Sequence, residues 1–237
     1  MGNELGIVFT GGEGPPPGRC RAVLEEARAG NRKALIAAAD SGLIAAEAAG
    51  VRPDWIIGDM DSVAGGRLAA YGPERVLRYP ADKDYTDTEL AVSLLREKGS
   101  ARIWIIGGGG GRIDHLFAIR SLFERDRPPE RWITSREDIR CLESPGALEC
   151  TPGGNVPRGR GLSERPGDAA PANGEKPYPI SVFPLGTGPW KAASRGLKWP
   201  LTGLVWERGF FGLSNEAPEG AFTIYAETGR FMVILPA

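Results

Sequence analysis

The amino-acid sequence predicts an α/β fold in two parts, a parallel-sheet α/β domain over residues 1–140 and a small antiparallel β-sandwich domain over residues 141–237. Two observations lead to this prediction. In the first part, short apolar runs alternate with segments of helical periodicity, and the runs are continuously apolar, as in parallel strands covered on both faces. In the second part, short β-like runs are separated by turn residues, and no long helical pattern is evident.

Local signals place the elements of the first part. Strands are expected over residues 5–9, 33–39, 54–58, 75–80, 101–108 and 131–135. Helices are expected over residues 19–30, 43–50, 86–99 and 112–126. The helix over 86–99 has the clearest signals, because Thr86 and Glu89 form a capping box and Leu90, Leu94 and Leu95 share one face.

The second part shows strand patterns on either side of an unusual segment. Strands are expected over residues 178–185, 203–211, 221–227 and 230–236, with 139–144 and 147–150 as further candidates. Residues 152–177 are rich in Pro, Gly and charged residues and contain almost no large apolar residues. Such a composition cannot bury enough surface to offset its ordering entropy, so it predicts a flexible insertion.

Composition excludes several classes of protein. A net charge of −1 over 237 residues provides no basic surface for a nucleic acid. The most apolar long run is interrupted by Asp40 and Glu47, so we expect no membrane span, and the N-terminus lacks the features of a signal peptide. Three cysteines without metal-ligand spacing argue against a disulfide framework or a zinc site and are typical of the reducing cytoplasm.

Four acidic or glycine-rich clusters follow predicted strands. They are Asp40-Ser41-Gly42, Asp59 and Asp61 in "GDMDS", "KDYTD" at 83–87, and "GGGGGRIDH" at 107–115. In an open α/β sheet the ligand crevice lies at the carboxyl ends of the strands. We therefore expect these clusters to converge on one edge of the sheet.

Asp59 and Asp61 are candidate metal ligands. In an extended strand they would point to the same face, with Met60 pointing to the other. Two neighbouring carboxylates repel each other unless a cation lies between them, and a divalent metal ion is the obvious candidate. A solvated Asp-rich turn is the alternative.

The other charged residues also have structural alternatives. Taken in isolation, Asp40 favours the role of a helix N-cap slightly over that of a ligand. Asp87 would complement a helix dipole, and Lys83 would be an ordinary surface charge.

The five glycines from Gly107 to Gly111 are harder to explain structurally, because a simple turn needs one or two. A strand, a glycine loop and a helix start can form a cradle of backbone N–H groups for phosphate. The spacing matches neither a Walker A loop nor the dinucleotide-binding motif. Arg112 follows, where its planar fork could grip a phosphate, and Asp114 could ligate a metal or cap the helix. His115, the sole histidine, has no nucleophile beside it and is expected to be structural.

Carboxylates, a glycine cradle and basic residues together indicate Mg²⁺-dependent chemistry on a nucleoside polyphosphate. The motifs "ADSG", "GDMDS", "KDYTDTE", "GGGGGRIDH", "GLKWPL" and "GLSNE" occur in this order over about residues 38–216. In sequence and order they resemble the thiamine pyrophosphokinase family.

The resemblance implies an ATP-binding catalytic domain over 1–140 and a thiamine-binding β-sandwich over 141–237. It implies a homodimer with active sites at the subunit interface, and transfer of the pyrophosphoryl group of ATP to thiamine with Mg²⁺, giving thiamine diphosphate and AMP. A pyrophosphokinase for another heterocyclic alcohol, such as a hydroxymethylpterin, and a non-catalytic thiamine or nucleotide sensor are the alternatives.

The resemblance also implies roles by position. The implied metal ligands are Asp59, Asp61 and Asp87, and these with Arg112 form the implied catalytic set. Thr86, Arg112 and Asp114 match residues that contact the nucleotide or its phosphates, and Asp40 lies beside the acidic site. Lys83 and the loop glycines Gly109 and Gly110 complete the predicted nucleotide-binding set. Trp199 matches the aromatic residue that stacks on thiamine, with Ser214 and Asn215 near the pyrimidine ring. A core tryptophan is the alternative for Trp199, and either Asp59 or Asp87 could take the hydroxyl proton.

Overall fold

The computed structural model describes residues 4–29, 34–63, 65–151 and 179–237. The predicted insertion at 152–177 therefore lies outside the described residues. The chain separates into two compact units. Unit 1 comprises Met1–Leu122 and Pro129–Ser135, and unit 2 comprises Phe123–Pro128 and Arg136–Ala237.

The described residues of unit 1 form a parallel sheet, as predicted. Its strands are β1 (Glu4–Thr10), β2 (Ala34–Ala39), β3 (Trp55–Gly58), β4 (Val76–Arg78), β5 (Ser100–Gly107) and β6 (Arg131–Ile133). They lie in the order β6-β5-β1-β2-β3-β4, and every neighbouring pair is parallel. The chain reverses its direction across the sheet between β1 and β5. Ligands bind at such switch points, beyond the carboxyl ends of the strands.

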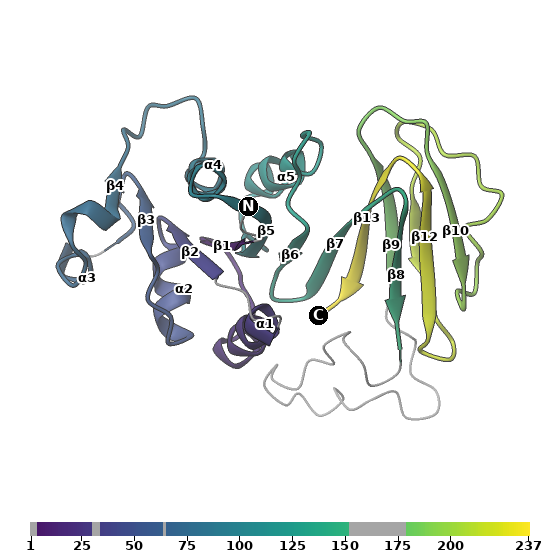
Figure 1. Ribbon diagram of the computed structural model, residues 1–237, viewed down its shortest axis with the longest axis horizontal. Coiled ribbons are helices and arrows are strands. Elements are labelled where there is room, and N and C mark those ends of the chain that lie inside the picture. Colours follow the sequence, from purple (N-terminus) through teal and green to yellow (C-terminus); the bar gives the residue numbers. More distant parts are fainter. Residues whose placement is uncertain (1–3, 30–33, 64, 152–178) are drawn as a thin grey trace. The chain divides into compact units, whose positions relative to one another are not determined.

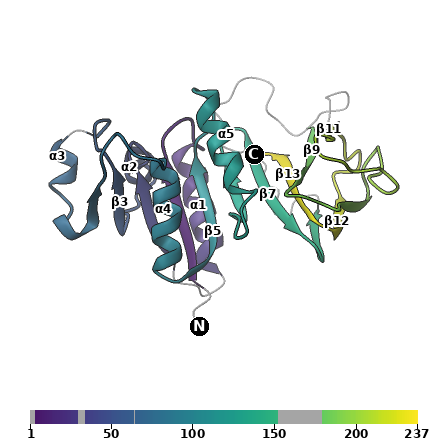
Figure 2. The same cartoon turned by 90° about the horizontal axis from the view of Figure 1, so that it is seen from above.

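Helices cover both faces of this sheet (Figure 1). They are α1 (Pro17–Ala29), α2 (Gly42–Ala48), α4 (Asp87–Glu97) and α5 (Ile113–Leu122). Figure 1 shows α1 and α2 on one face and α4 and α5 on the other. The short helix α3 (Gly65–Leu68) lies beyond β3 at the outer edge, as Figure 1 and Figure 2 both show, and the turn η1 (Pro73–Arg75) precedes β4.

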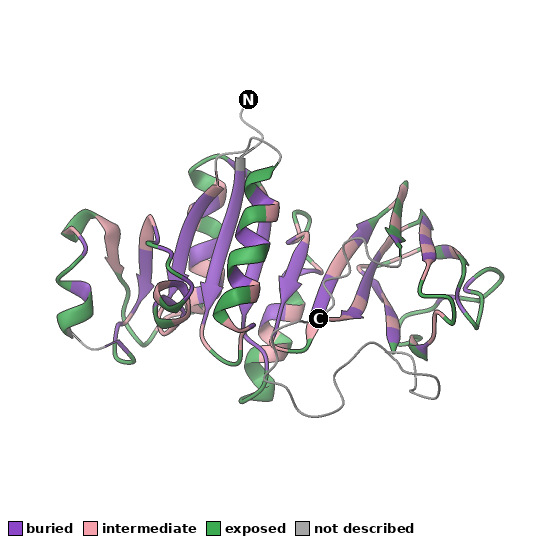
Figure 3. Cartoon of the chain, turned by 90° about the horizontal axis from the view of Figure 1, so that it is seen from below, coloured by how far each residue is buried: buried purple, intermediate pink, exposed green. Residues whose placement is uncertain are grey.

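The core of unit 1 forms where α1 and α2 pack on the central strands. Leu5, Ile7 and Phe9 of β1 are fully buried, and Leu24 of α1 and Ala46 of α2 belong to the same cluster. Full burial of a Leu, Ile or Phe side chain contributes roughly 1.5–3 kcal/mol. Figure 3 shows the central strands buried along their length, whereas the helices expose their outer faces. Continuous apolar strands are the consequence of this two-sided cover.

Helix α2 approaches β1 so closely that its first residue must be glycine. A Cβ on Gly42 would lie 2.3 Å from the carbonyl oxygen of Phe9 and 2.8 Å from the Cα of Thr10. Backbone atoms cannot move aside as a flexible side chain can. The third residue of the cluster Asp40-Ser41-Gly42 is therefore a packing requirement.

Helix α4 begins where the capping box predicts. The backbone N–H of Glu89 donates to Thr86 Oγ1 at 3.2 Å, and the backbone N–H of Thr86 donates to Glu89 Oε2 at 2.8 Å. Two N–H groups that have no carbonyl partner within the helix thereby donate to side chains. The cap fixes the position of Asp87 and Thr88 in the first turn.

Unit 2 is the predicted antiparallel sandwich. Its strands are β7 (Glu137–Glu143), β8 (Gly146–Cys150), β9 (Ile180–Leu185), β10 (Lys191–Arg195), β11 (Gly212–Asn215), β12 (Phe222–Thr228) and β13 (Arg230–Pro236). One sheet has the order β11-β9-β13-β7 and the other β10-β12-β8. Val182 and Phe231 of the first sheet share a buried cluster with Ile224 and Ala226 of the second, so the two sheets pack face to face.

The strand expected over 203–211 is wrong. These residues form turns, and only Trp206 makes an isolated β-bridge, with Trp190. Gly203 and Gly209 take positive φ angles of 83° and 87°, which turn the chain out of an extended path. Strands β10 and β11 form on either side of this segment instead.

Two further properties bear on the class of protein. No helix in the described ranges is long and apolar enough to cross a membrane. None of Cys20, Cys141 and Cys150 forms a disulfide. Burial raises the pKa of Cys20 and of Cys150 to about 11, so neither is a reactive thiolate at neutral pH.

Candidate active site

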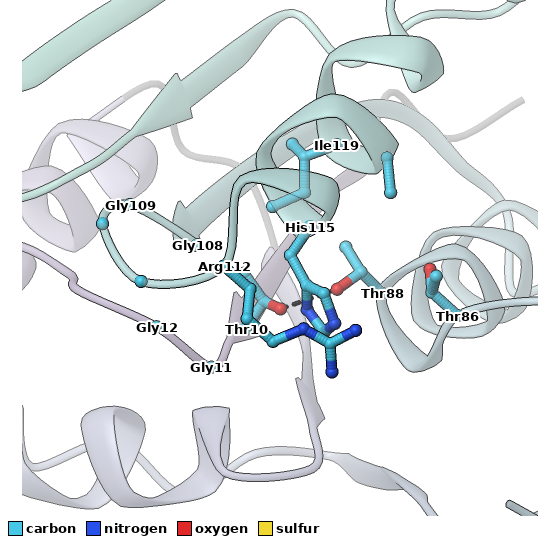
Figure 4. Close-up of a pocket in the computed structure, with 13 residues that line it drawn as sticks. Thr10, Gly11, Gly12, Thr86, Thr88, Gly108, Gly109, Arg112, His115 and Ile119 are labelled. Atoms are coloured by element: carbon cyan, nitrogen blue, oxygen red, sulfur yellow. Dashed lines mark hydrogen bonds between the residues drawn. The ribbon is translucent and has the colours of Figure 1, made fainter.

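A cavity of about 240 Å³ lies at the carboxyl ends of β1 and β5. It is lined by Thr10, Gly11, Gly12, Thr86, Thr88, Gly108, Gly109, Gly110, Gly111, Arg112, His115, Ala118 and Ile119. Figure 4 shows the two loops that follow β1 and β5 on one side of the cavity, with α5 above it. The cavity lies at the switch point of the sheet, where α/β folds bind ligands.

A hydroxyl pair forms one wall of the cavity. Thr10 Oγ1 and Thr88 Oγ1 lie 2.6 Å apart and both residues are buried (Figure 4). The hydrogen bond joins the end of β1 to the first turn of α4. Sequence reasoning did not select Thr10, Thr88 or the two glycines that follow Thr10. The available signal was the "TGG" that directly follows the first strand.

The glycine loop is bonded to the loop after β1. The backbone N–H of Glu13 donates to the carbonyl of Gly109 at 2.6 Å, and the N–H of Gly109 donates to the carbonyl of Glu13 at 2.8 Å. The N–H of Gly108 donates to the carbonyl of Gly11 at 2.9 Å. Because the amides of Gly108 and Gly109 already donate to these carbonyls, fewer glycine amides can bind phosphate than the five-glycine run predicts.

Gly110 and Gly111 remain as candidate phosphate donors. Their φ angles are 60° and 62°, a left-handed conformation that glycine adopts without strain. Within the described residues their backbone amides form no hydrogen bond. Successive backbone N–H groups in a turn can form an anion-binding concavity.

Arg112 and Asp114 form an exposed ion pair at the start of α5. Arg112 Nε donates to Asp114 Oδ1 at 3.1 Å, and the terminal nitrogen Nη2 donates to Oδ2 at 2.5 Å. The contact raises the pKa of Arg112 and lowers the pKa of Asp114, so both stay charged. Figure 4 shows Arg112 and His115 projecting from α5 toward the side of the cavity where Thr10 and Thr88 lie. His115 therefore lines the cavity, although the sequence predicted only a structural role.

Three carboxylates converge beyond the adjacent strands. Oxygen atoms of Asp40, Asp59 and Asp61 all lie within 4.8 Å of one another. Asp40 follows β2, and the other two follow β3. Such a group of hard oxygen ligands suits a divalent cation such as Mg²⁺.

Asp87 lies against this group from the first turn of α4. A Cβ on Gly58 would lie 3.2 Å from Asp40 Cβ and 3.4 Å from Asp87 Cγ, so the absence of a side chain there lets the two carboxylates approach. The buried oxygen Oδ1 of Asp40 accepts no hydrogen bond, whereas Oδ1 of Asp87 has the ammonium of Lys83 at 3.2 Å. A buried carboxylate oxygen without a donor, as in Asp40, fits an incoming cation.

The prediction that Asp59 and Asp61 share one face of an extended strand is wrong. Strand β3 ends at Gly58, and Met60 has a left-handed φ of 67°. Its side chain is only 6% exposed, in a cluster with Leu43 and Ile56. The backbone N–H of Asp61 donates to Asp59 Oδ1 at 3.2 Å. A buried anchor in an unusual backbone conformation, rather than strand alternation, brings the two carboxylates together.

Two other structural alternatives are also wrong. Ser41, not Asp40, occupies the N-cap position of α2, and no side chain caps that helix. Lys83 is not a surface charge, because its side chain is only 15% exposed. Its Nζ lies 3.2 Å from Asp87 Oδ1 and donates to the carbonyl of Pro80 at 2.9 Å. The first turn of α4 thus lies between the cavity and the carboxylate group. Thr86 and Thr88 line the cavity, and Asp87 lies at the carboxylates.

Replacing Asp87 with asparagine is expected to raise the melting temperature of the metal-free protein at neutral pH. Burial is the largest cause that raises the pKa of Asp87, Lys83 opposes it, and Asp40 and Asp59 add to it. A carboxyl whose pKa is raised by folding stabilises the protein below its unfolded pKa, and that stability is lost as pH rises through the folded pKa. Asparagine never carries this buried charge. The gain should therefore appear at neutral pH and vanish in acid, where Asp87 is itself protonated.

Thermal unfolding in EDTA at neutral and acid pH would measure this effect. Asp82→Asn is the matched control, because Asp82 is an exposed carboxylate in the same loop. It should leave the melting temperature unchanged at either pH. A lower melting temperature for Asp87→Asn at neutral pH would contradict the argument.

The residues predicted to bind thiamine lie in unit 2. Trp199 is 50% exposed, so the alternative of a core tryptophan is wrong. The ammonium of Lys198 lies 4.4 Å from the centroid of the indole ring. Ser214 is exposed and has a left-handed φ of 56° at an irregularity in β11, and Asn215 beside it is buried.

A comparison with protein families supports the resemblance. Residues 27–129 match the family described as "Thiamin pyrophosphokinase, catalytic domain". This segment of the chain is similar to thiamin pyrophosphokinase catalytic domains. The match includes the carboxylate cluster, the first turn of α4 and the glycine loop. A search among curated proteins gives no match.

Solved thiamin pyrophosphokinase structures share the fold of the whole chain. The enzyme from Bacillus subtilis superposes with a TM-score of 0.66 at 23% identity, covering 99% of both chains. The enzyme from Geobacillus thermodenitrificans gives a TM-score of 0.65 at 22% identity, covering 98% of this chain and 97% of that one. The enzyme from Candida albicans gives 0.65 at 15% identity, covering 99% and 89%. At these identities the thiamin pyrophosphokinase structures establish the fold.

Proposed function

We propose that this protein is a thiamine pyrophosphokinase, which transfers the pyrophosphoryl group of ATP to the hydroxyl group of thiamine and releases thiamine diphosphate and AMP. The observation that carries the proposal is the first turn of α4. Within a catalytic domain of this family it presents Thr86 and Thr88 to a cavity bounded by a glycine loop, and Asp87 to a carboxylate cluster. Such a site can receive a polyphosphate and a divalent cation together.

In this proposal the cavity binds the phosphates of ATP and the carboxylates bind the metal ion. The amides of Gly110 and Gly111 and the guanidinium of Arg112 are suited to hold phosphate oxygens, with Gly109 fixing the loop. Asp114 would hold Arg112 through their ion pair, and Asp40 lies among the carboxylates. Thr86 caps α4 and Lys83 pairs with Asp87 in its first turn.

Mg²⁺ fits the carboxylates. Asp59, Asp61 and Asp87 would hold it, and Asp40 offers a fourth carboxylate within reach. When bound, the ion neutralises phosphate charge and orients the transferred group. Asp87 is suited to take the hydroxyl proton, because burial raises its pKa. Asp59 remains the alternative acceptor.

Thiamine recognition is assigned to unit 2. An exposed indole suits a flat pyrimidine ring or a cationic thiazolium, and Ser214 and Asn215 lie on the neighbouring strand. A homodimer belongs to the same proposal, supported by exposed apolar side chains such as Ile113, Phe117 and Val205. A cytoplasmic location is supported by three cysteines that form no disulfide.

Incubation of the purified protein with ATP, Mg²⁺ and thiamine, followed by chromatography of the products, tests the proposal. We expect AMP and thiamine diphosphate in equal amounts, and neither product when EDTA is present. If no thiamine diphosphate forms, hydroxymethylpterin is the next substrate to test. Binding of thiamine or nucleotide without turnover of either alcohol would indicate a sensor instead.

A further inference from the structure

Asn215 makes a set of hydrogen bonds that contact with a substrate would not require. The residue is only 6% exposed. Oδ1 accepts from the backbone N–H of Trp199 at 3.2 Å and from that of Glu216 at 2.8 Å. Nδ2 donates to the carbonyl of Trp199 at 2.6 Å. All three partners are backbone groups of fixed donor or acceptor character, so the orientation of the amide is determined.

This bonding uses up the acceptor capacity of the side chain. An amide oxygen has two lone pairs, and both are engaged with backbone N–H groups. Only one N–H of the amide nitrogen remains. An asparagine with a free side chain could both donate to and accept from an aminopyrimidine. Asn215 has no acceptor left for the amino group of that ring.

The same bonds clamp the chain on both sides of Trp199. The backbone N–H of Lys198 donates to the carbonyl of Glu216 at 2.8 Å, and Lys198 Nζ pairs with Glu216 Oε2 at 2.8 Å. On the other side Pro200 restricts the backbone of Trp199 to extended conformations. The indole is thus half-exposed on a backbone that hydrogen bonds hold on one side and Pro200 restricts on the other.

We infer that Asn215 is a positioning residue, which fixes the backbone that presents the indole of Trp199 as a platform for the ring of thiamine, and which does not itself read the aminopyrimidine. The inference rests on the proposed function. An immobilised aromatic platform avoids the entropy loss of ordering a side chain on binding. The buried amide on strand β11 thereby acts on the substrate through another residue.

The first test compares thiamine with an analogue whose pyrimidine amino group is replaced by hydrogen. For Asn215→Ala we expect kcat/KM to fall by the same factor with both substrates, about 10–100-fold, as for the loss of a supporting residue behind a ligand. The KM for ATP should not change. If Asn215 contacts the amino group directly, the variant loses efficiency with thiamine alone, and that outcome would overturn the inference.

The second test reports on Trp199 without requiring turnover. The chain has six tryptophans, so ¹⁹F NMR of protein labelled with 5-fluorotryptophan can resolve them, and the signal of Trp199 can be assigned from Trp199→Phe. Asn215→Ala should shift and broaden that signal far more than the other five. An unchanged Trp199 signal would contradict positioning, whereas absence of turnover in the wild-type protein would count against the proposed function only.

Two further variants keep the inference testable. Glu219→Gln, at an exposed turn residue of the same unit, should change neither the kinetics nor the Trp199 signal. Pro200→Ala loosens the platform from its other side without touching the amide, and it remains usable if Asn215→Ala does not fold. It should broaden the Trp199 signal and lower kcat/KM equally for both substrates. A Pro200→Ala protein with a wild-type Trp199 signal and wild-type kinetics would count against the rigid platform.

Discussion

Replacing Asp59 or Asp61 with asparagine is expected to lower the rate of thiamine diphosphate formation about a thousandfold, a barrier increase of about 4 kcal/mol. Each carboxylate belongs to the group whose oxygens lie within 4.8 Å of one another. An amide of the same shape keeps the fold but removes a negative charge from the site that would hold the metal. Steady-state turnover at saturating ATP and thiamine measures the loss, and circular dichroism checks the fold.

The matched control is Glu74→Gln, which neutralises an exposed carboxylate of η1 outside the cluster. Its turnover should equal that of the wild type. Raising the Mg²⁺ concentration should restore part of the activity of Asp61→Asn if the lost function is metal binding. Wild-type turnover in either cluster variant would remove the metal assignment.

Replacing Gly42 with alanine is expected to destabilise unit 1 by about 3 kcal/mol, the upper part of the usual range for overpacking. The new Cβ would lie 2.3 Å from the Phe9 carbonyl oxygen, and backbone atoms on both sides must move apart. For a chain of this size, the melting temperature should fall by about 10 °C. Differential scanning calorimetry would measure the shift.

Gly66→Ala provides the comparison with an opposite expected sign. A Cβ at Gly66 meets nothing within 4 Å, and the residue lies in the short helix α3. Alanine is favoured over glycine in a helix by up to about 1 kcal/mol. If Gly42→Ala were as stable as Gly66→Ala, the close contact between α2 and β1 would not limit packing.

The sequence predicted those parts of the fold that local signals determine. The parallel strands of unit 1 are continuous apolar runs. The capping box of Thr86 and Glu89 predicts the start of α4. Strand β10 was not predicted, because its sequence, "KAASR", contains no β-branched or aromatic residue. It is extended because it pairs with β12, which is a tertiary effect that overrides propensity.

The candidate site was predictable in its residue types and less so in its geometry. Carboxylates at strand ends could be expected to converge, because parallel strands end on one edge of the sheet. The left-handed Met60 could not be expected, because nothing in the sequence distinguishes it from an extended residue. Likewise, the engagement of the Asn215 amide with Trp199 joins residues 16 apart in the sequence, and only the folded chain reveals it.

The pair of hydrogen bonds between Glu13 and Gly109 has a consequence for the proposed binding of a nucleotide. A run of five glycines has more backbone freedom to lose than any other sequence of that length. Because Gly108 and Gly109 are already bonded to the loop after β1, much of that entropy is lost during folding and not during binding. In the proposed function, a nucleotide would therefore meet a loop that is largely ordered in advance, and the free energy of its contacts with the phosphates would contribute more fully to affinity.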